Sequence, residues 1–243
     1  MKYFVLIIFF QTSVELVFSQ NAATKSTNQL LDLSVTAGSS RGTVAAAYVY
    51  NWHKGKKQQW DLGLGARLTT SFGTKQDYTT APARISRGST TPFIVVVSQQ
   101  KTENWDTLVV QRPLTASLNA TANIGYHFNS KWSAGFNIDL IGFTVGRKSS
   151  AVLTSNGVTR TEPVAKPAPF NILLTGDLDY GSLNSEFFIK YNWNEHWGIR
   201  AVYQFVFSEY KTTTIKQTAP DGTMVDRFRN KANNLGIGLS YHF

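Results

Sequence analysis

Residues 197–207 read Trp-Gly-Ile-Arg-Ala-Val-Tyr-Gln-Phe-Val-Phe, with a large or apolar side chain at every odd position. The even positions carry Gly, Arg, Val and Gln. Because successive side chains of a β-strand point to opposite faces, this period predicts a strand with one apolar and one mixed face. The stretch is also as long as a tilted strand that crosses a bilayer, about 9–11 residues.

Further segments of the chain alternate in the same way, and their apolar faces end in large aromatic side chains. These segments are 31–38, 44–52, 60–68, 114–128, 132–140, 187–193 and 235–243. A soluble sandwich would carry many Lys and Glu on its outer face, whereas here the second face is small or polar. We therefore predict an all-β fold, a closed antiparallel up-and-down transmembrane β-barrel of eight strands. A ten-stranded barrel that draws strands from 170–180 or 94–97 is the alternative.

A Tyr-x-aromatic motif recurs at 50–52, 126–128, 191–193 and 241–243, and a short polar turn and then Trp follow its first three copies. Tyr and Trp prefer the membrane–water interface, because each has an apolar ring and one polar group. The repeat predicts a periplasmic aromatic girdle made of Tyr50, Trp52, Trp60, Tyr126, Phe128, Trp132, Tyr191, Trp193, Trp197 and Tyr241.

The connections at the other strand ends are long, apart from 39–43. They cover 71–113, 146–185 and 208–232, and we predict them as extracellular loops, since outer-membrane barrels have short periplasmic turns. Two apolar stretches inside the first loop, 92–97 and 107–110, leave three options open. They pair as strands above the membrane, fold in as a plug, or line a pocket for a hydrophobic ligand.

Residues 1–19 have the pattern of a cleaved signal peptide, with Lys2 before an apolar run and small residues at the cleavage site. We expect the mature chain to begin at Gln20, or at Asn21, with a short segment over 20–30 and the barrel over 31–243. The chain has no Cys, which excludes a lipidated cysteine, disulfides and thiolate chemistry.

Eight strands leave an interior that side chains just fill. The inward positions include three acids and three bases: Asp32, Asp61, Arg67, Asp139, Lys190 and Arg200. Since an isolated buried charge is costly, this balance predicts an interior ion network. A selectivity lining for solute passage is the alternative.

The four histidines, His53, His127, His196 and His242, fall at the short-turn rim. A lipid-modifying enzyme needs a His beside a Ser at the opposite, outer-leaflet rim. We therefore predict no catalytic residue and no enzyme activity. We also predict no cofactor and no metal, because no two histidines lie within ligand reach in one segment.

The segment 235–243, which ends in Tyr-His-Phe, resembles the C-terminal signature of bacterial outer-membrane proteins. The segment 129–143 resembles small outer-membrane barrels of Bacteroidota, mostly of unassigned function. The resemblance implies location in the bacterial outer membrane, contact with its lipid, and Phe243 as the signal read by the barrel assembly machinery.

The formal net charge is +9, and the long loops carry more Lys and Arg than Asp and Glu. We predict a non-enzymatic barrel with a structural role, or a surface-binding role through these loops, which would face lipopolysaccharide phosphates that Arg can grip bidentately. The alternative is a porin-like transport barrel for small or hydrophobic solutes, and a lipid-modifying enzyme is a third class. No nucleic-acid partner is expected, since the aromatics lie in the bilayer bands.

Overall fold

The computed structural model describes residues 28–92, 94–155 and 157–243. The predicted signal peptide, and the N-terminal segment up to residue 27, lie outside the described residues. Among the described helices, none is long and apolar enough to cross a membrane.

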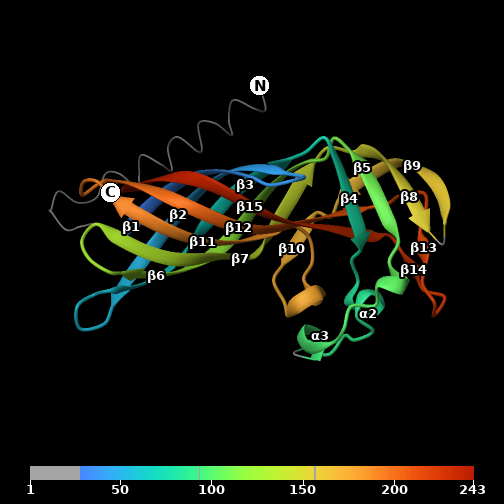
Figure 1. Cartoon of the computed structure of the whole chain (residues 1–243), viewed down its shortest axis with the longest axis horizontal. Coiled ribbons are helices and arrows are strands. Elements are labelled where there is room, and N and C mark those ends of the chain that lie inside the picture. The colour runs from blue at the N-terminus through green and yellow to red at the C-terminus, as the bar shows by residue number, and fades with distance from the viewer. Residues whose placement is uncertain (1–27, 93, 156) are drawn as a thin grey trace, which may run out of the picture.

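Eight long antiparallel strands lie side by side along the molecule (Figure 1). Each pairs with the next, and the last pairs back with the first, so that the hydrogen bonding closes into a ring. We call this the eight-strand ring. In order of pairing its members are β1 (Gln29–Ala37), β2 (Gly42–Lys54), β3 (Trp60–Phe72), β6 (Leu114–His127), β7 (Trp132–Gly146), β11 (Leu183–Asn192), β12 (Trp197–Lys211) and β15 (Arg227–His242).

The long loops contain four more strands of the same sheet, which stand upright at one end of the ring (Figure 1). They are β4 (Lys75–Thr80), β5 (Thr107–Gln111), β8 (Ser149–Ser155) and β9 (Val158–Pro167). β15 pairs with β4, β4 with β5, β5 with β8, β8 with β9, and β9 with β12. Because β12 also pairs with β15, these six strands close a second ring. We call it the extension.

The whole sheet has thirteen strands, so the predicted count of eight and the alternative of ten are both wrong. Each predicted segment lies in a strand, apart from at most its last residue, but the loops form strands of their own. β10 (Phe170–Ile172) adds to β7, whereas Ile94–Val97 is the short helix α3. The remaining elements are α2 (Ala83–Ser86), η1 (Thr102–Asn104), η2 (Gly176–Leu178) and the hairpin of β13 (Gln217–Thr218) and β14 (Met224–Val225).

The two rings have opposite polarity. In the eight-strand ring the outward positions are large and apolar, among them Leu68 and Ile237, which are 50% and 66% exposed. The inward positions are buried and mostly polar, from Asp32 and Ser34 on β1 to Ser240 on β15. Such a ring buries its polar groups and leaves its apolar groups outside.

The extension buries apolar groups instead. Its interior cluster consists of Tyr78, Leu108, Val110, Ala151, Leu153, Ala165, Tyr210 and Phe228. Outward positions such as Lys75, Asp77 and Thr161 are polar and exposed. This is the ordinary arrangement of a domain in water, and it shows that the apolar stretch 107–110 pairs as a strand.

The change of polarity takes place within single strands. On β12 the inward side chain of Gln204 is buried among polar groups in the eight-strand ring, whereas the inward side chain of Tyr210, six residues further along, is buried in the apolar cluster of the extension. On β15 the inward, polar Asn234 in the ring and the inward, apolar Phe228 in the extension are related in the same way. β12 and β15 belong to both rings, so they carry the boundary between two kinds of surroundings.

Candidate functional site

Four of the six predicted interior charges meet in one buried network at mid-height of the eight-strand ring. Arg67 Nη1 lies 3.4 Å from Asp139 Oδ1, and the Arg200 guanidinium contacts the Asp32 carboxylate. The two halves are joined by Glu186, whose Oε2 lies 3.2 Å from Arg67 Nη2 and 3.4 Å from Arg200 Nη2. All five side chains are nearly inaccessible to solvent.

The sequence reasoning missed Glu186. The predicted strand began at residue 187, whereas β11 begins at Leu183. Extending the alternation back by one inward position from Phe188 would have placed Glu186 inside with Lys190.

Amide and hydroxyl side chains fill the levels above and around the network. Gln204 Oε1 accepts hydrogen bonds from Thr36, Thr43 and Asn234. Asp139 accepts from the Nδ2 groups of Asn119 and Asn184 at 2.9 and 3.1 Å. The bonds to Asp139 join neighbouring strands, whereas Gln204 on β12 reaches past β15 to β1 and β2, and Asn184 on β11 donates to Thr69 on β3, so side chains cross part of the interior at more than one level.

The other two predicted charges lie closer to the short turns and outside this network. Lys190 Nζ is 3.0 Å from His242 Nε2. Asp61 lies between two imidazoles, with Oδ1 2.5 Å from His53 Nδ1 and Oδ2 2.7 Å from His127 Nε2. His53 is an inward residue of β2, directly opposite Asp61 on β3.

The predicted girdle residues form several groups of ring contacts around the short-turn end. Ring centroids are 4.9 Å apart in Trp60–Tyr126, Trp132–Tyr191 and Trp197–Tyr241. Phe243 packs edge-on against Tyr241 and Tyr48 and so links the chain end to β2. The five Trp residues of the girdle are between 41% and 48% exposed.

The opposite end of the eight-strand ring carries a group of exposed cations where it meets the extension. Arg147 Nη1 donates to the Arg112 carbonyl at 3.3 Å, and the Arg112 N–H donates to Thr74, next to Lys75. Lys148 and Lys166 flank the paired residues Ser149 and Ala165. We call Lys75, Arg112, Arg147, Lys148 and Lys166 the junction cations; all are exposed.

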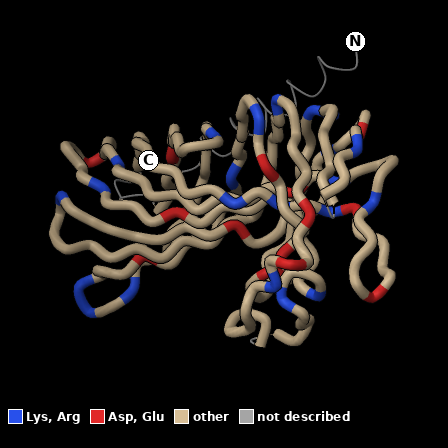
Figure 2. The backbone as a smooth tube through the Cα atoms, turned by 45° about the vertical axis from the view of Figure 1, so that its right-hand side comes forward, with Lys and Arg blue, Asp and Glu red and all other residues tan. Residues whose placement is uncertain are grey.

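The junction cations lie just beyond the last exposed apolar side chains of the ring, such as Phe72 and Val145. Basic positions also occur at the opposite end of the molecule, in the turn that contains Lys56 and Lys57 (Figure 2). The exposed carboxylate of Asp77 lies two residues beyond Lys75 on β4, so the junction is cationic but not free of acids.

In the extension, buried carboxylates contact Lys and Arg side chains or accept hydrogen bonds from backbone N–H groups. Asp177 contacts Arg87, Arg229 and Lys231. Burial alone would raise the pKa of Asp177, but hydrogen bonds from Arg87 and Lys231 hold that pKa below its ordinary value. Glu162 accepts backbone N–H groups of Val164, Thr214 and Ile215, and these bonds likewise lower its pKa against the effect of burial.

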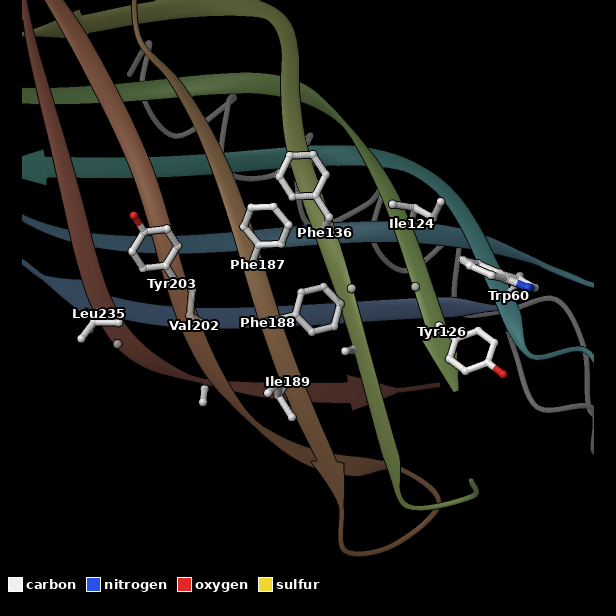
Figure 3. Close-up of a pocket in the computed structure, with 15 residues that line it drawn as sticks. Trp60, Ile124, Tyr126, Phe136, Phe187, Phe188, Ile189, Val202, Tyr203 and Leu235 are labelled. Carbon is white, nitrogen blue, oxygen red and sulfur yellow. The ribbon is translucent and has the colours of Figure 1, made fainter. Parts of the chain in front are cut away.

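A hollow of about 600 Å³ lies on the apolar outer face of the eight-strand ring. Phe136, Phe187 and Tyr203 stand beside one another on β7, β11 and β12 (Figure 3). Ala134, Gly135 and Ala201 leave the space between these rings open. The lining is almost wholly apolar, so a ligand in the hollow would find apolar contacts but hardly any group to hydrogen-bond with.

No protein-family model matches the chain, and no curated protein matches it in sequence. Among solved structures, Neisserial surface protein A is 10% identical over 88% of this chain and 96% of its own, with a TM-score of 0.38. Ail, the attachment invasion locus protein of Yersinia pestis, is 12% identical over 88% and 95%, at 0.32. The Pseudomonas putida toluene transporter TodX is 8% identical over 88% and 77%, at 0.22. No function is carried over from matches this distant.

Proposed function

We propose that the chain is an integral β-barrel protein of the bacterial outer membrane, closed to solutes and non-enzymatic, which holds its extension in the lipopolysaccharide layer. The observation that carries this proposal is the change of polarity along β12 and β15. A ring with exposed Leu, Ile, Val and Phe all around its outside is stable only in a hydrocarbon solvent. A ring with an apolar interior and polar outside belongs in water.

The interior network supports a closed barrel rather than a pore. The side chains of Arg67 and Arg200 are each 1% exposed, and each contacts carboxylates on other strands. Moving these side chains aside would separate buried charges, which costs about 3–5 kcal/mol per broken pair. A passage along the axis is therefore expensive to open.

The junction cations support contact with lipopolysaccharide. They lie where the apolar band ends and the polar extension begins, which is the level of the lipid headgroups in this orientation. Arg112 and Arg147 have no carboxylate partner within salt-bridge distance among the described residues. Guanidinium groups bind phosphate with two parallel hydrogen bonds, so phosphorylated lipid fits this group well.

Surface labelling tests the orientation. The natural sequence has no Cys, so Thr159→Cys and Lys216→Cys in the extension, and Ser130→Cys in a short turn, each give a single label site. We expect a membrane-impermeant maleimide to label the first two on intact cells, and Ser130→Cys only after the outer membrane is permeabilised. Labelling of Ser130→Cys alone on intact cells would invert the proposal.

Two matched variants test whether the junction cations bind lipopolysaccharide. Arg112→Glu combined with Arg147→Glu and Lys148→Glu reverses three junction cations. Lys54→Glu combined with Lys56→Glu and Lys57→Glu reverses three exposed cations at the opposite end. We expect the first variant to bind fluorescent lipopolysaccharide at least tenfold more weakly in detergent, and the second to bind like the unmodified protein. Equal weakening in both would remove the junction as the binding surface.

Transport of small or hydrophobic solutes is the second candidate function. It is favoured by the hollow of about 600 Å³ on the apolar outer face of the eight-strand ring. In planar bilayers we expect no discrete channel openings. Regular openings in the purified protein would favour transport over the closed barrel.

The non-enzymatic part of the proposal is supported by the histidines. His53 and His127 are bonded to Asp61, His196 to a backbone carbonyl, and His242 to Lys190. In the described part of the chain no serine hydroxyl is bonded to any of the four imidazoles, so the pair that acyl transfer requires is not assembled. Release of fatty acid from outer-membrane lipid by the purified protein would contradict this part.

A further inference from the structure

At the short-turn end of the eight-strand ring, three neighbouring strands bring two imidazoles to one carboxylate. His53 lies on β2, Asp61 on β3 and His127 on β6. One ligand atom from each lies within 4.8 Å of the others. The expectation of no metal site considered only histidines within one segment, whereas separate strands supply these three groups.

The strand register explains this meeting. His53 is paired directly with Asp61 across β2 and β3, and Asp61 with Gly125 across β3 and β6. His127 is the next inward residue of β6 after Gly125. A Cβ at position 125 would lie 3.3 Å from Asp61 Cβ and 3.5 Å from Asp61 Oδ2, so the glycine leaves the His127 ring a clear approach to the carboxylate.

The cluster is open to solvent and to ions. His53 and His127 are 29% and 25% exposed, whereas Asp61 is 11% exposed. All three line a pocket of about 170 Å³ whose other walls include the polar side chains of Asn51, Asn192 and Glu195. This pocket has room for an ion and for water molecules that would complete its coordination.

We propose that His53, Asp61 and His127 form a binding site for a divalent transition metal ion, with Zn²⁺ the best match. Two imidazole nitrogens and one carboxylate oxygen are a donor set that suits Zn²⁺ and its neighbours, whereas Ca²⁺ and Mg²⁺ prefer oxygen ligands alone. Three protein ligands leave a coordination position for water from the pocket.

Binding needs only a small rearrangement. The two contacts of 2.5 and 2.7 Å are hydrogen bonds between the future ligands. Around a tetrahedral ion with bonds of about 2.05 Å, ligand atoms lie about 3.3 Å apart. Each imidazole must therefore move away from Asp61 by less than about 1 Å, and the two imidazole nitrogens, which lie within 4.8 Å of each other, must approach by at most about 1.5 Å. Rotations about χ at a partly exposed rim can supply both movements. A bound ion would then tie β2, β3 and β6 together below the ion network.

The test uses the full-length mature protein, folded in detergent and stripped with EDTA. Zinc titration by calorimetry and metal counting after dialysis should give one ion per chain, and Co²⁺ should give a visible absorption band. We expect His127→Gln and Asp61→Asn each to weaken zinc binding at least tenfold. The matched control is His196→Gln, which removes an exposed imidazole at the same rim that is outside the cluster.

Folding of each variant is checked by its heat-modifiable migration, and either ligand variant alone is sufficient if the other does not fold. Failure of the unmodified protein to take up zinc at micromolar concentration would overturn the proposal. So would equal zinc affinity in His127→Gln and His196→Gln. Equal uptake of Ca²⁺ would show that the donor set does not select as proposed. None of these results depends on the membrane orientation.

Discussion

Glu186 on β11 and Arg67 on β3 meet inside the eight-strand ring, with Oε2 3.2 Å from Nη2. β6 and β7 lie between these strands in the sheet, so the contact reaches across the interior rather than between neighbours. The same carboxylate contacts Arg200 on β12. One side chain thus joins two arginines that approach it from different sides of the ring.

We expect Glu186→Gln to lower the free energy of unfolding by about 3 kcal/mol, the lower end of the range for a broken buried pair. The cost stays at that end because Arg67 keeps Asp139 and Arg200 keeps Asp32. The measurement is urea-induced unfolding in detergent or lipid, followed by migration on gels. Glu103→Gln, at an exposed position of η1, is the control and should unfold like the unmodified protein. Equal midpoints for both variants would mean that Glu186 does not hold the network.

The extension should lose its structure independently of the eight-strand ring. Leu153 is 1% exposed in the apolar cluster of the extension, whereas its neighbour Thr154 points the other way and is partly exposed. Leu153→Asp removes a buried Leu, worth about 2–5 kcal/mol, and adds a carboxylate without a partner. We expect rapid protease cleavage between β4 and β9, with heat-modifiable migration of the remaining barrel retained.

Thr154→Asp is the control for this variant, because it adds the same charge on the solvent side. It should resist protease like the unmodified protein. If Leu153→Asp also abolished membrane assembly, the two rings would form one cooperative unit, contrary to the division made at β12 and β15.

Glu162 should hold the segment after β12 in a pH-dependent way. Its carboxylate accepts the N–H groups of Thr214 and Ile215 at 3.0 and 2.8 Å and the Thr213 hydroxyl at 3.0 Å. Because its folded pKa is lowered from 4.5, the stabilisation is complete above pH 4.5 and is lost as the pH falls through the lower folded value.

We therefore expect hydrogen-exchange protection at Thr214 and Ile215, corrected for intrinsic rates, to stay constant from neutral pH to about pH 4.5 and to fall below it. Glu162→Gln should reduce that protection about tenfold at neutral pH, since bonds to a charged acceptor are stronger than bonds to an amide. Thr161→Ala, an exposed neighbour, should leave it unchanged. Unchanged protection in Glu162→Gln would assign the order of this segment to other contacts.

The sequence predicted the strands of the eight-strand ring well, because each of these strands has one apolar and one polar face, so that its alternation is strong. It left strand pairing of 107–110 as one of three options and did not predict the rest of the extension, whose strands are short: β4 covers Lys75–Thr80 and β5 Thr107–Gln111. The six-residue alternation of β4 resembles an ordinary loop, and β5 pairs with β8, which comes from a different connection of the chain.

The candidate site was predictable only in part, for a similar reason. The alternation of each strand was enough to place Asp32, Arg67, Asp139 and Arg200 on the inward face. It does not show how far along the barrel axis each residue lies, which we call its height. Height depends on the stagger between strands, which brings Asp61 level with His53 and His127 while Lys190 meets His242. The cluster of three strands therefore appears only once the register is known.

The aromatic girdle gives the last prediction. Five of the six Trp residues, namely Trp52, Trp60, Trp132, Trp193 and Trp197, are exposed around the short-turn end, whereas Trp105 follows η1 in the extension. Since Trp and Tyr settle at the headgroup level, lipids brominated near the headgroup should quench most of the Trp fluorescence in reconstituted protein. Trp105→Phe should leave the quenched fraction unchanged or raise it slightly. A variant that keeps Trp105 alone should be quenched little, because the proposed orientation holds the extension above the bilayer. Strong quenching of that single Trp by lipids brominated deep in the acyl chains would place the extension in the membrane and contradict the proposed orientation.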